Sequence, residues 1–110
     1  SPRPVVVVET DRAAYRVGKT VTAAVRLREN IMCFCLEHSW RVYVQEVGTG
    51  RVVGEWEWTA RASEEGFRAR ALAWVAEREG RYRVVAVLCG HGEGSKEVDV
   101  APSEGQSRAP

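Results

Sequence analysis

The sequence predicts a single antiparallel Greek-key β-sandwich of about seven strands, with an eight-strand barrel as the alternative. Three observations favour this all-β class. Short apolar or alternating segments recur about every ten residues, glycine-containing polar turns separate them, and no stretch has the periodicity of an amphipathic helix. The 110 residues are enough for one hydrophobic core and too few for a second domain.

The first two strands are expected at residues 5–8 and 19–28, with a turn region at 11–18 between them. The first segment is an unbroken β-branched run, which favours a strand. Its members are Val5, Val6, Val7 and Val8. In the second segment Val21 and Val25 alternate with Thr22, the pattern of a strand with one buried face.

A β-hairpin is expected next, with arms at 40–47 and 51–60 around a loop of Gly48, Thr49 and Gly50. In the second arm one face should carry the apolar residues and the other the acidic ones. The apolar set is Val52, Trp56 and Trp58, and the acidic set is Glu55 and Glu57. We interpret the first set as core and the second as a solvated face balanced by arginines.

Strands at 67–75, 82–89 and 96–100 complete the prediction. The alternation slips near Ala71 and Leu72, which predicts a β-bulge there. The run at 84–89 is apolar on both faces, as expected of a central strand covered by its neighbours. The predicted domain therefore occupies residues 1–100, and residues 101–110 form a Pro/Ser/Gly-rich tail.

Composition excludes two classes of partner. The net charge of +1 comes from 16 basic and 15 acidic residues spread along the chain, so we expect no nucleic-acid binding. No apolar run approaches the length of a membrane span, so we expect no membrane insertion. Abundant charge with a single Met and few amide side chains is typical of a thermophile. A start at Ser1 is consistent with signal cleavage and an extracellular or cell-surface location.

All cysteines and histidines lie in two clusters. The first contains Cys33, Cys35 and His38, and the second contains Cys89 and His91. In a seven-strand sandwich the loops that carry them, after the second and the sixth strands, emerge at the same end. The sequence therefore predicts that the two clusters lie close together.

Two interpretations of these clusters remain open. In the first, Cys89 forms a disulfide with Cys35 or Cys33, which would stabilise the domain by about 2–5 kcal/mol, and no cofactor is needed. In the second, His38, Cys89 and His91 bind copper or zinc, with Cys33 or Cys35 as an added ligand. The disulfide is favoured because Cys-x-Cys differs from the usual Cys-x-x-Cys zinc motif.

Three segments resemble strand pairs of prokaryotic immunoglobulin-like domains. They are residues 15–27 (YRVGKTVTAAVRL), 41–53 (RVYVQEVGTGRVV) and 79–87 (EGRYRVVAV). The resemblance implies a secreted, non-catalytic structural or adhesive module rather than an enzyme. Its expected partners are other copies of itself or surface proteins. The valines at 5–8 could add to the sheet of a neighbouring subunit, as in donor-strand assembly, and so build a filament.

Two segments are similar to the segments that surround the copper site in cupredoxins and in the copper domain of haem-copper oxidases. They are residues 36–44 (LEHSWRVYV) and 80–92 (GRYRVVAVLCGHG). This similarity implies His38, Cys89 and His91 as the strong ligands. The sequence departs from the family in having one residue between Cys89 and His91 and no Met after them. Superoxide reductase, another small β-sandwich, is set aside because its iron needs four histidines and this chain has two.

Overall fold

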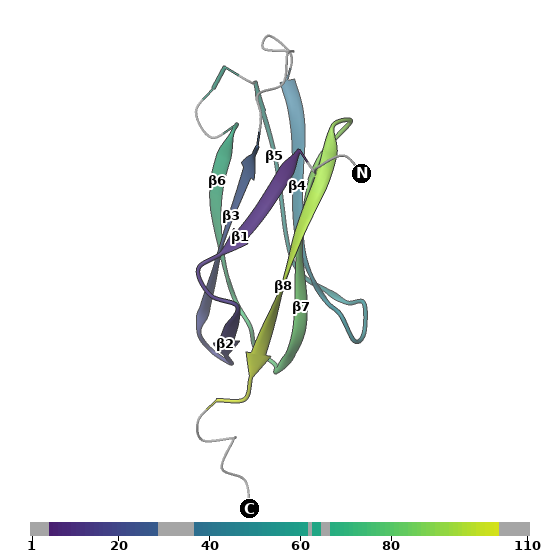
Figure 1. Cartoon of the computed structure of the whole chain (residues 1–110). Helices are drawn as coiled ribbons and strands as arrows, with labels where there is room; N and C mark the ends of the chain where they lie inside the picture. Colours follow the sequence, from purple (N-terminus) through teal and green to yellow (C-terminus); the bar gives the residue numbers. More distant parts are fainter. Residues whose placement is uncertain (1–4, 29–36, 62, 65–66, 104–110) are drawn as a thin grey trace, which may run out of the picture.

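The computed structural model describes residues 5–28, 37–61, 63–64 and 67–103. They form two packed β-sheets (Figure 1) and contain no helix; in particular, no described helix could span a membrane. In chain order the strands are β1 (Val6–Thr10), β2 (Ala14–Arg16), β3 (Thr20–Leu27), β4 (Glu37–Glu46), β5 (Val52–Arg61), β6 (Ala69–Val75), β7 (Gly80–Leu88) and β8 (Gly92–Ala101).

One sheet has the order β1-β3-β6 and the other the order β2-β8-β7-β4-β5. Paired strands are antiparallel except β2 and β8. The core fills the space between the sheets, because alternate residues of each strand face the opposite sheet. The largest fully buried side chains are Trp40, Tyr82, Phe67 and Leu88, with valines from several strands around them. The predicted all-β sandwich is confirmed.

The first strand is divided between the two sheets, which is why eight strands are found where about seven were expected. β1 pairs with β3, and after a short connection β2 pairs in parallel with β8. Asp11 organises this change of sheet: its carboxylate accepts hydrogen bonds from the Tyr15 hydroxyl and, at 3.3 Å, from the Thr22 amide. The segment expected to be only a turn thus contains a three-residue strand.

The hairpin of β4 and β5 confirms the prediction, with one correction. The register shifts between Val44 and Gln45, so Val53 is an extra residue in β5. Val52 therefore faces outward with Gln45 and is 46% exposed. The expectation that it shares a face with the tryptophans was wrong, because the bulge inverts the alternation at that point.

The bulge expected near Ala71 and Leu72 is absent from the described β6. Its pairing with β3 runs without interruption from Ala69 to Val75. The pattern looked irregular because Arg70 occupies the inward face, opposite Val25. Its guanidinium lies 4.4 Å from the centroid of the Trp58 ring, where a cation–π contact offsets the placement of a charge beside the core. An inward charge on an edge strand also discourages pairing with foreign strands.

β7 lies between β8 and β4, and this explains its apolar composition on both faces. Val84, Ala86 and Leu88 belong to the core. Val85 points to the outer face of the sheet, opposite Tyr43 and Ser95, and is nevertheless only 4% exposed. Neighbouring side chains on both flanking strands therefore cover it, as the sequence predicted for a central strand.

Tyr82 anchors the connection that precedes β7. Its hydroxyl donates a 2.7 Å hydrogen bond to the Arg78 carbonyl, and its ring packs edge-on against Trp74 with centroids 4.8 Å apart. Burial is the main cause of the raised pKa of Tyr82. A tyrosine bonded to the backbone a few residues upstream at a sheet-crossing corner is a feature of immunoglobulin sandwiches.

The backbones of β1 and β8, which belong to different sheets, lie in direct contact. A Cβ atom at Gly94 would lie 2.8 Å from the carbonyl carbon of Val6 and closer still to its oxygen. Only glycine fits this contact between two backbones. The N-terminal strand is therefore held on one side by pairing with β3 and on the other by direct contact with β8.

We expect Gly94→Ala to lower the free energy of unfolding by at least the roughly 1–3 kcal/mol typical of overpacking. The added methyl would meet the backbone of Val6 rather than a side chain that could move. Urea denaturation measures the change. Gly48→Ala is the matched control, since a Cβ there would meet nothing within 4 Å. Equal stability of the two variants would contradict the close approach of β1 and β8.

The Asp11 contacts predict a specific acid sensitivity. The hydrogen bond from Tyr15 is the main cause that lowers the pKa of Asp11 below its ordinary value of 3.8. Because the folded-state pKa is the lower one, this stabilisation is present above the unfolded-state value and is lost as the pH falls through the folded-state pKa. Urea denaturation between pH 7 and pH 2 should show a smaller acid-dependent loss for Asp11→Asn than for the parent. Tyr15→Phe, which removes the donor, should resemble Asp11→Asn; parental acid dependence in both variants would contradict this assignment.

Candidate functional site

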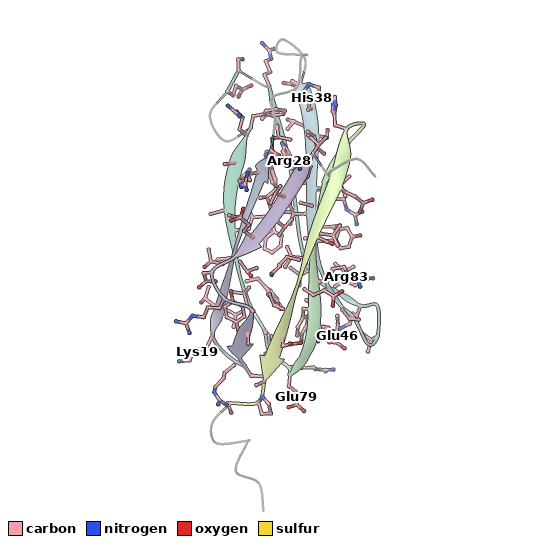
Figure 2. All side chains as sticks on the ribbon, in the orientation of Figure 1. Lys19, Arg28, His38, Glu46, Glu79 and Arg83 are labelled. Carbon is pink, nitrogen blue, oxygen red and sulfur yellow. The ribbon has the colours of Figure 1, made fainter. Side chains whose placement is uncertain are left out.

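The two sequence clusters meet, in part, at one end of the sandwich. β4 pairs with β7 so that Trp40 lies opposite Leu88, and the Cys89 amide donates a 2.9 Å hydrogen bond to the Ser39 carbonyl. The turn between β7 and β8 therefore lies beside the start of β4 (Figure 1). Figure 2 shows His38 at this end, which we call the histidine end, and Lys19 and Glu79 at the opposite end.

His38 and His91 are in direct contact. The Nε2 atom of His91 lies 3.2 Å from the Nδ1 atom of His38, and the ring centroids are 4.9 Å apart at an edge-to-face angle of 67°. His38 is half-buried, and His91 is exposed. Residues 53 positions apart in the chain thus share one site, which agrees with the proximity expected from the fold.

The backbone places both histidines at this end of the sandwich. His38 pairs with Ala60 across β4 and β5, and its ring packs on the buried ring of Phe67 at a centroid distance of 5.5 Å. His91 follows a tight turn in which its amide donates a 2.9 Å hydrogen bond to the Leu88 carbonyl. Gly90 allows this turn because its φ is +82°, a value that glycine adopts without strain.

Cys89 does not join the two histidines. It is opposite Ser39 and follows the inward-facing Leu88, so alternation directs its side chain to the outer face of the five-stranded sheet. There it borders a shallow depression of about 400 Å³ lined also by Arg41, Glu57 and Thr59. Its thiol is exposed and has no disulfide partner among the described residues.

The remaining predicted ligands, Cys33 and Cys35, lie outside the described residues. Within the part of the chain that the structure describes, no three His, Cys, Asp or Glu side chains are close enough to share a metal ion. Of the set His38, Cys89 and His91, the structure brings together only the two histidines. The disulfide and the involvement of the other two cysteines remain predictions.

The outer face of the five-stranded sheet is covered by ion pairs. Arg41 lies 2.6 Å from Glu55 and 3.9 Å from Glu57, which confirms the expectation of acidic residues balanced by arginine. The hydrogen bond with Glu55 is the main cause that raises the pKa of Arg41.

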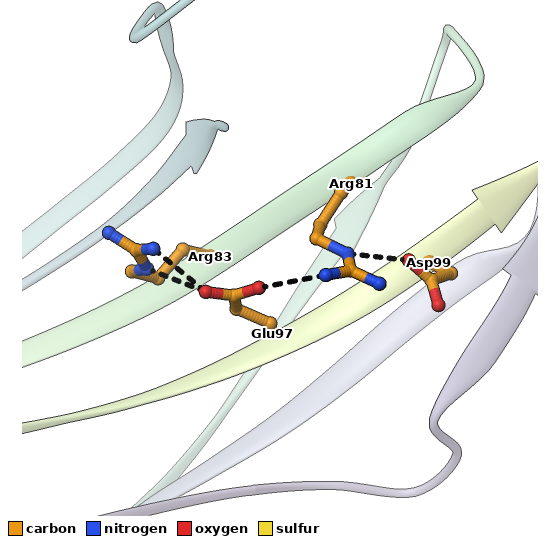
Figure 3. A network of polar contacts seen from close by, with 4 residues as sticks. All are labelled: Arg81, Arg83, Glu97 and Asp99. Atoms are coloured by element: carbon orange, nitrogen blue, oxygen red, sulfur yellow. Dashed lines mark hydrogen bonds and ion pairs between the residues drawn. The ribbon is translucent and has the colours of Figure 1, made fainter. Parts of the chain in front are cut away.

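Figure 3 shows a second ion-pair network on the same face, across β7 and β8. Arg83 lies 2.7 Å from Glu97, and Arg81 lies 3.6 Å from Glu97 and 3.0 Å from Asp99. These cross-strand pairs alternate along the strands with the core residues. Exposed pairs of this kind stabilise little individually, but they make this face highly charged and well solvated.

The outer face of the three-stranded sheet has the opposite character. Along β3 and β6 its residues are small and uncharged, and we call this set the alanine face. Its members are Thr20, Thr22, Ala24, Ala69, Ala71, Ala73 and Val75. All are exposed, Val75 by 47%. Glu9 and Arg26 beside it neutralise each other at 2.7 Å. Sequence analysis overlooked this surface, although the alternation of Ala69, Ala71 and Ala73 with larger residues was a visible signal.

The four N-terminal valines, predicted to mediate self-association, divide between the faces of their own sheet. Val6 and Val8 are buried in the core, opposite Leu27 and Val25. Val7 is half-buried on the outer face beside the alanine face, and Val5 packs partly against the core. Within one chain, therefore, β1 completes its own sheet.

Comparison with known proteins identifies the fold. No family model and no curated protein sequence matches the chain. Among solved structures, the chain is similar to the CARDB domain of a Pyrococcus furiosus protein, solved in complex with di-metal ions (TM-score 0.60, 18% identity, 93% of this chain and 96% of that chain). It is also similar to superoxide reductase from Ignicoccus hospitalis (TM-score 0.61, 12% identity, 88% and 80%). A third match is a Paenibacillus cycloisomaltooligosaccharide glucanotransferase (TM-score 0.66, 16% identity, 86% and 13%).

These identities are low, so the similarities establish the β-sandwich fold alone. The CARDB domain has the same extent as this chain, whereas the match to the glucanotransferase covers only 13% of that protein. The same sandwich accordingly occurs as a complete small domain and as a module of a larger chain. Function must therefore be argued from the surfaces of this chain.

The position of Cys89 generates a chemical test. In the folded, reduced protein we expect Cys89 to react with a maleimide nearly as fast as in urea, because its side chain is exposed. Mass spectrometry of proteolytic fragments locates the label, and Cys89→Ser is the control. Labelling of Cys89 only after unfolding would contradict its place on the outer face.

Proposed function

We propose that this chain is a non-catalytic, extracellular structural or adhesive module that associates with other copies of itself. The observation that carries the proposal is the contrast between the outer faces of the two sheets. One is covered by ion pairs of Arg41, Arg81 and Arg83, and the other is the uncharged alanine face. Uncharged exposed patches of up to a few hundred Å² occur on many monomers and are often functional.

A second copy of the chain is the partner that best fits this face. Opposite Ala24 in β3 lies Ala71 in β6, and opposite Thr22 lies Ala73, so only small side chains project from these pairs. Two such surfaces can meet about a two-fold axis without collision, and an isologous contact requires this self-complementarity. The adjacent charges, Glu9 and Arg26, are already paired within one chain. Like charges therefore do not oppose the contact.

The size of the face indicates a weak contact. Two strands about 4.8 Å apart and about 23 Å long present on the order of 200 Å² per copy. A standard protein interface buries about 800 Å² per partner. The face alone would therefore form a transient dimer, and stable assembly would need several modules or a second contact.

The N-terminal strand is our candidate for that second contact. An isologous face forms closed dimers, whereas a filament needs a head-to-tail contact that repeats. β1 lies at the edge of its sheet and near the start of the chain, with Val6 and Val8 buried opposite β3. The same contacts form if β1 of one copy occupies this position in the next, which is donor-strand exchange.

The extracellular location rests on the predicted disulfide between Cys89 and Cys35 or Cys33, since disulfides are typical of oxidising compartments. The loop of about fifty residues that it closes would stabilise the module by about 2–5 kcal/mol. Proteolytic mapping without reduction should yield a fragment that joins the Cys89 peptide to the peptide with Cys33 and Cys35. Unlinked peptides from protein secreted into an oxidising compartment would contradict this part of the proposal.

The rival proposal is a small cupredoxin-like copper or zinc protein using His38, Cys89 and His91. The contact between His38 and His91 supports it. The direction of the Cys89 side chain, toward the other face of the sheet, weighs against a copper centre in which one thiolate joins two imidazoles. The self-associating module therefore accounts for more of the observed surface.

Sedimentation velocity over a wide concentration range tests the proposed contact. We expect the parent to dimerise weakly, and Ala71→Lys to need at least about tenfold higher concentration, because like charges would meet across the contact. Ser95→Lys, on the outer face of the five-stranded sheet, is the matched control and should behave as the parent. A parent that stays monomeric, or association unchanged by Ala71→Lys, would overturn the role of the alanine face.

A cross-link distinguishes strand exchange from face-to-face contact. Val8 and Val25 lie opposite each other in β1 and β3, so Val8→Cys with Val25→Cys can form a disulfide that holds β1 in its own chain. Strand exchange predicts that oxidation of this variant abolishes assemblies larger than a dimer. Persistence of long assemblies after oxidation would contradict strand exchange as the contact that builds them.

A further inference from the structure

The histidine end contains two imidazole nitrogens that face each other from separate parts of the chain. His38 contributes Nδ1 from the start of β4, and His91 contributes Nε2 from the turn before β8, 3.2 Å apart. The outer-face ion pairs and the alanine face do not include either residue. The contact thus has no part in the self-association proposed above.

The separation of these nitrogens matches that of two ligands on one metal ion. Zinc lies about 2.0–2.1 Å from an imidazole nitrogen, and two such bonds at the tetrahedral angle place the nitrogens about 3.3 Å apart. A divalent transition metal could therefore bind to both nitrogens once the rings turn so that both lone pairs point to it. Imidazole nitrogens favour zinc, copper and nickel, whereas calcium and magnesium prefer oxygen ligands.

We propose that His38 Nδ1 and His91 Nε2 together bind a divalent transition-metal ion of the zinc class, with water in the remaining positions. Among the described residues, the site consists of the two histidines. Cys89 is excluded because no third His, Cys, Asp or Glu among the described residues groups with them. A site of this kind keeps open positions, unlike a closed four-ligand structural site.

The two rings are preorganised for this role. Phe67, itself only 1% exposed, packs against His38 at 5.5 Å, which limits the rotation of that ring. The turn at Gly90 and the hydrogen bond from the His91 amide to the Leu88 carbonyl fix the backbone of His91. Ligands fixed by the backbone lose little conformational entropy on binding, so two of them can suffice for measurable affinity.

Metal binding requires a particular arrangement of protons on the two imidazole rings. In the metal-free pair, one imidazole donates its N–H to the facing nitrogen of the other. The metal needs a lone pair on both facing nitrogens, so the donating ring must carry its proton on its other nitrogen instead. The pair can therefore bind a metal only in the form in which both facing nitrogens are free of protons.

Bound metal would connect the start of β4 to the turn between β7 and β8. Since the unfolded chain lacks the paired geometry, the ion should stabilise the folded state in proportion to its occupancy. The bound ion would thus act as a metal-dependent cross-link between two segments at the histidine end. It does not rest on self-association, and the failure of either proposal leaves the other standing.

Isothermal titration of the full-length chain with ZnCl₂ at pH 7.5 tests the site, followed by the same titration of the variant Cys33→Ser, Cys35→Ser, Cys89→Ser. We expect one equivalent of Zn²⁺ to bind in both proteins, and MgCl₂ to give no signal. His38→Gln and His91→Gln in the cysteine-free background should each weaken zinc binding at least about tenfold. Loss of a residue that only hydrogen-bonds to a metal ligand already weakens metal binding by about this factor. Lys19→Gln, at the opposite end of the sandwich, is the control and should bind as the parent.

Two further measurements keep the test decisive. His91 is exposed, so His91→Gln should fold normally. If His38→Gln unfolds, the zinc titration of His91→Gln decides the proposal. X-ray absorption of the zinc-loaded cysteine-free protein should show two imidazole nitrogens at about 2.0–2.1 Å. Zinc binding that vanishes with the cysteines, or that is unchanged in His91→Gln, would overturn the proposal. Absence of any zinc binding at pH 7.5 would do so as well.

Discussion

The antiparallel pairing of β4 with β7 is the constraint on which the histidine end depends. It joins two strands from the middle and the end of the chain, with Trp40 opposite Leu88 and Val42 opposite Ala86. Because side chains alternate across a strand, a shift of one residue would turn every inward side chain outward. The observed register places His38 inward beside His91 and turns Cys89 to the opposite face. Cys89 and His91, two positions apart in the sequence, consequently occupy different environments.

The same alternation produces two unlike outer surfaces from one chain. On the five-stranded sheet, long charged side chains from neighbouring strands meet as ion pairs, and Val85 on the same face is only 4% exposed. On the three-stranded sheet, the outward positions of β3 and β6 are occupied by alanine and threonine, which cannot cover their neighbours. The inward positions of both sheets nevertheless carry a complete core. The fold does not require the two outer faces to differ. We therefore look for the function of the protein in this difference.

Much of the fold could be predicted from the sequence because local patterns determine it. The alternation of Val21 with Thr22, the glycines of the β4–β5 hairpin and the doubly apolar run of β7 all led to correct elements. What escaped prediction depends on contacts between distant segments. The side chain of Asp11 divides the first strand between two sheets, the shift at Val44 turns Val52 outward, and Arg70 faces inward because Trp58 lies beneath it. None of these partners is a sequence neighbour.

For the candidate site, sequence analysis correctly brought His38 and His91 to one end, because the order of strands in a sandwich determines which loops are neighbours. It could not foresee the direction of Cys89, since that follows from the turn and register around Leu88. Nor did it identify the alanine face. The alternation of Ala69, Ala71 and Ala73 with larger residues is visible in the sequence, but the outward residues of β3 complete the face only through the pairing of β3 with β6.

Nuclear Overhauser contacts measured by NMR on the labelled, reduced protein test the register most directly. The account predicts Hα–Hα contacts between Trp40 and Leu88, and between Val42 and Ala86, together with contacts between the ring protons of His38 and His91. It also predicts that the Cβ protons of Cys89 contact Ser39 and neither imidazole. Contacts between Cys89 and the ring of His38, or a register displaced by one residue, would contradict the account.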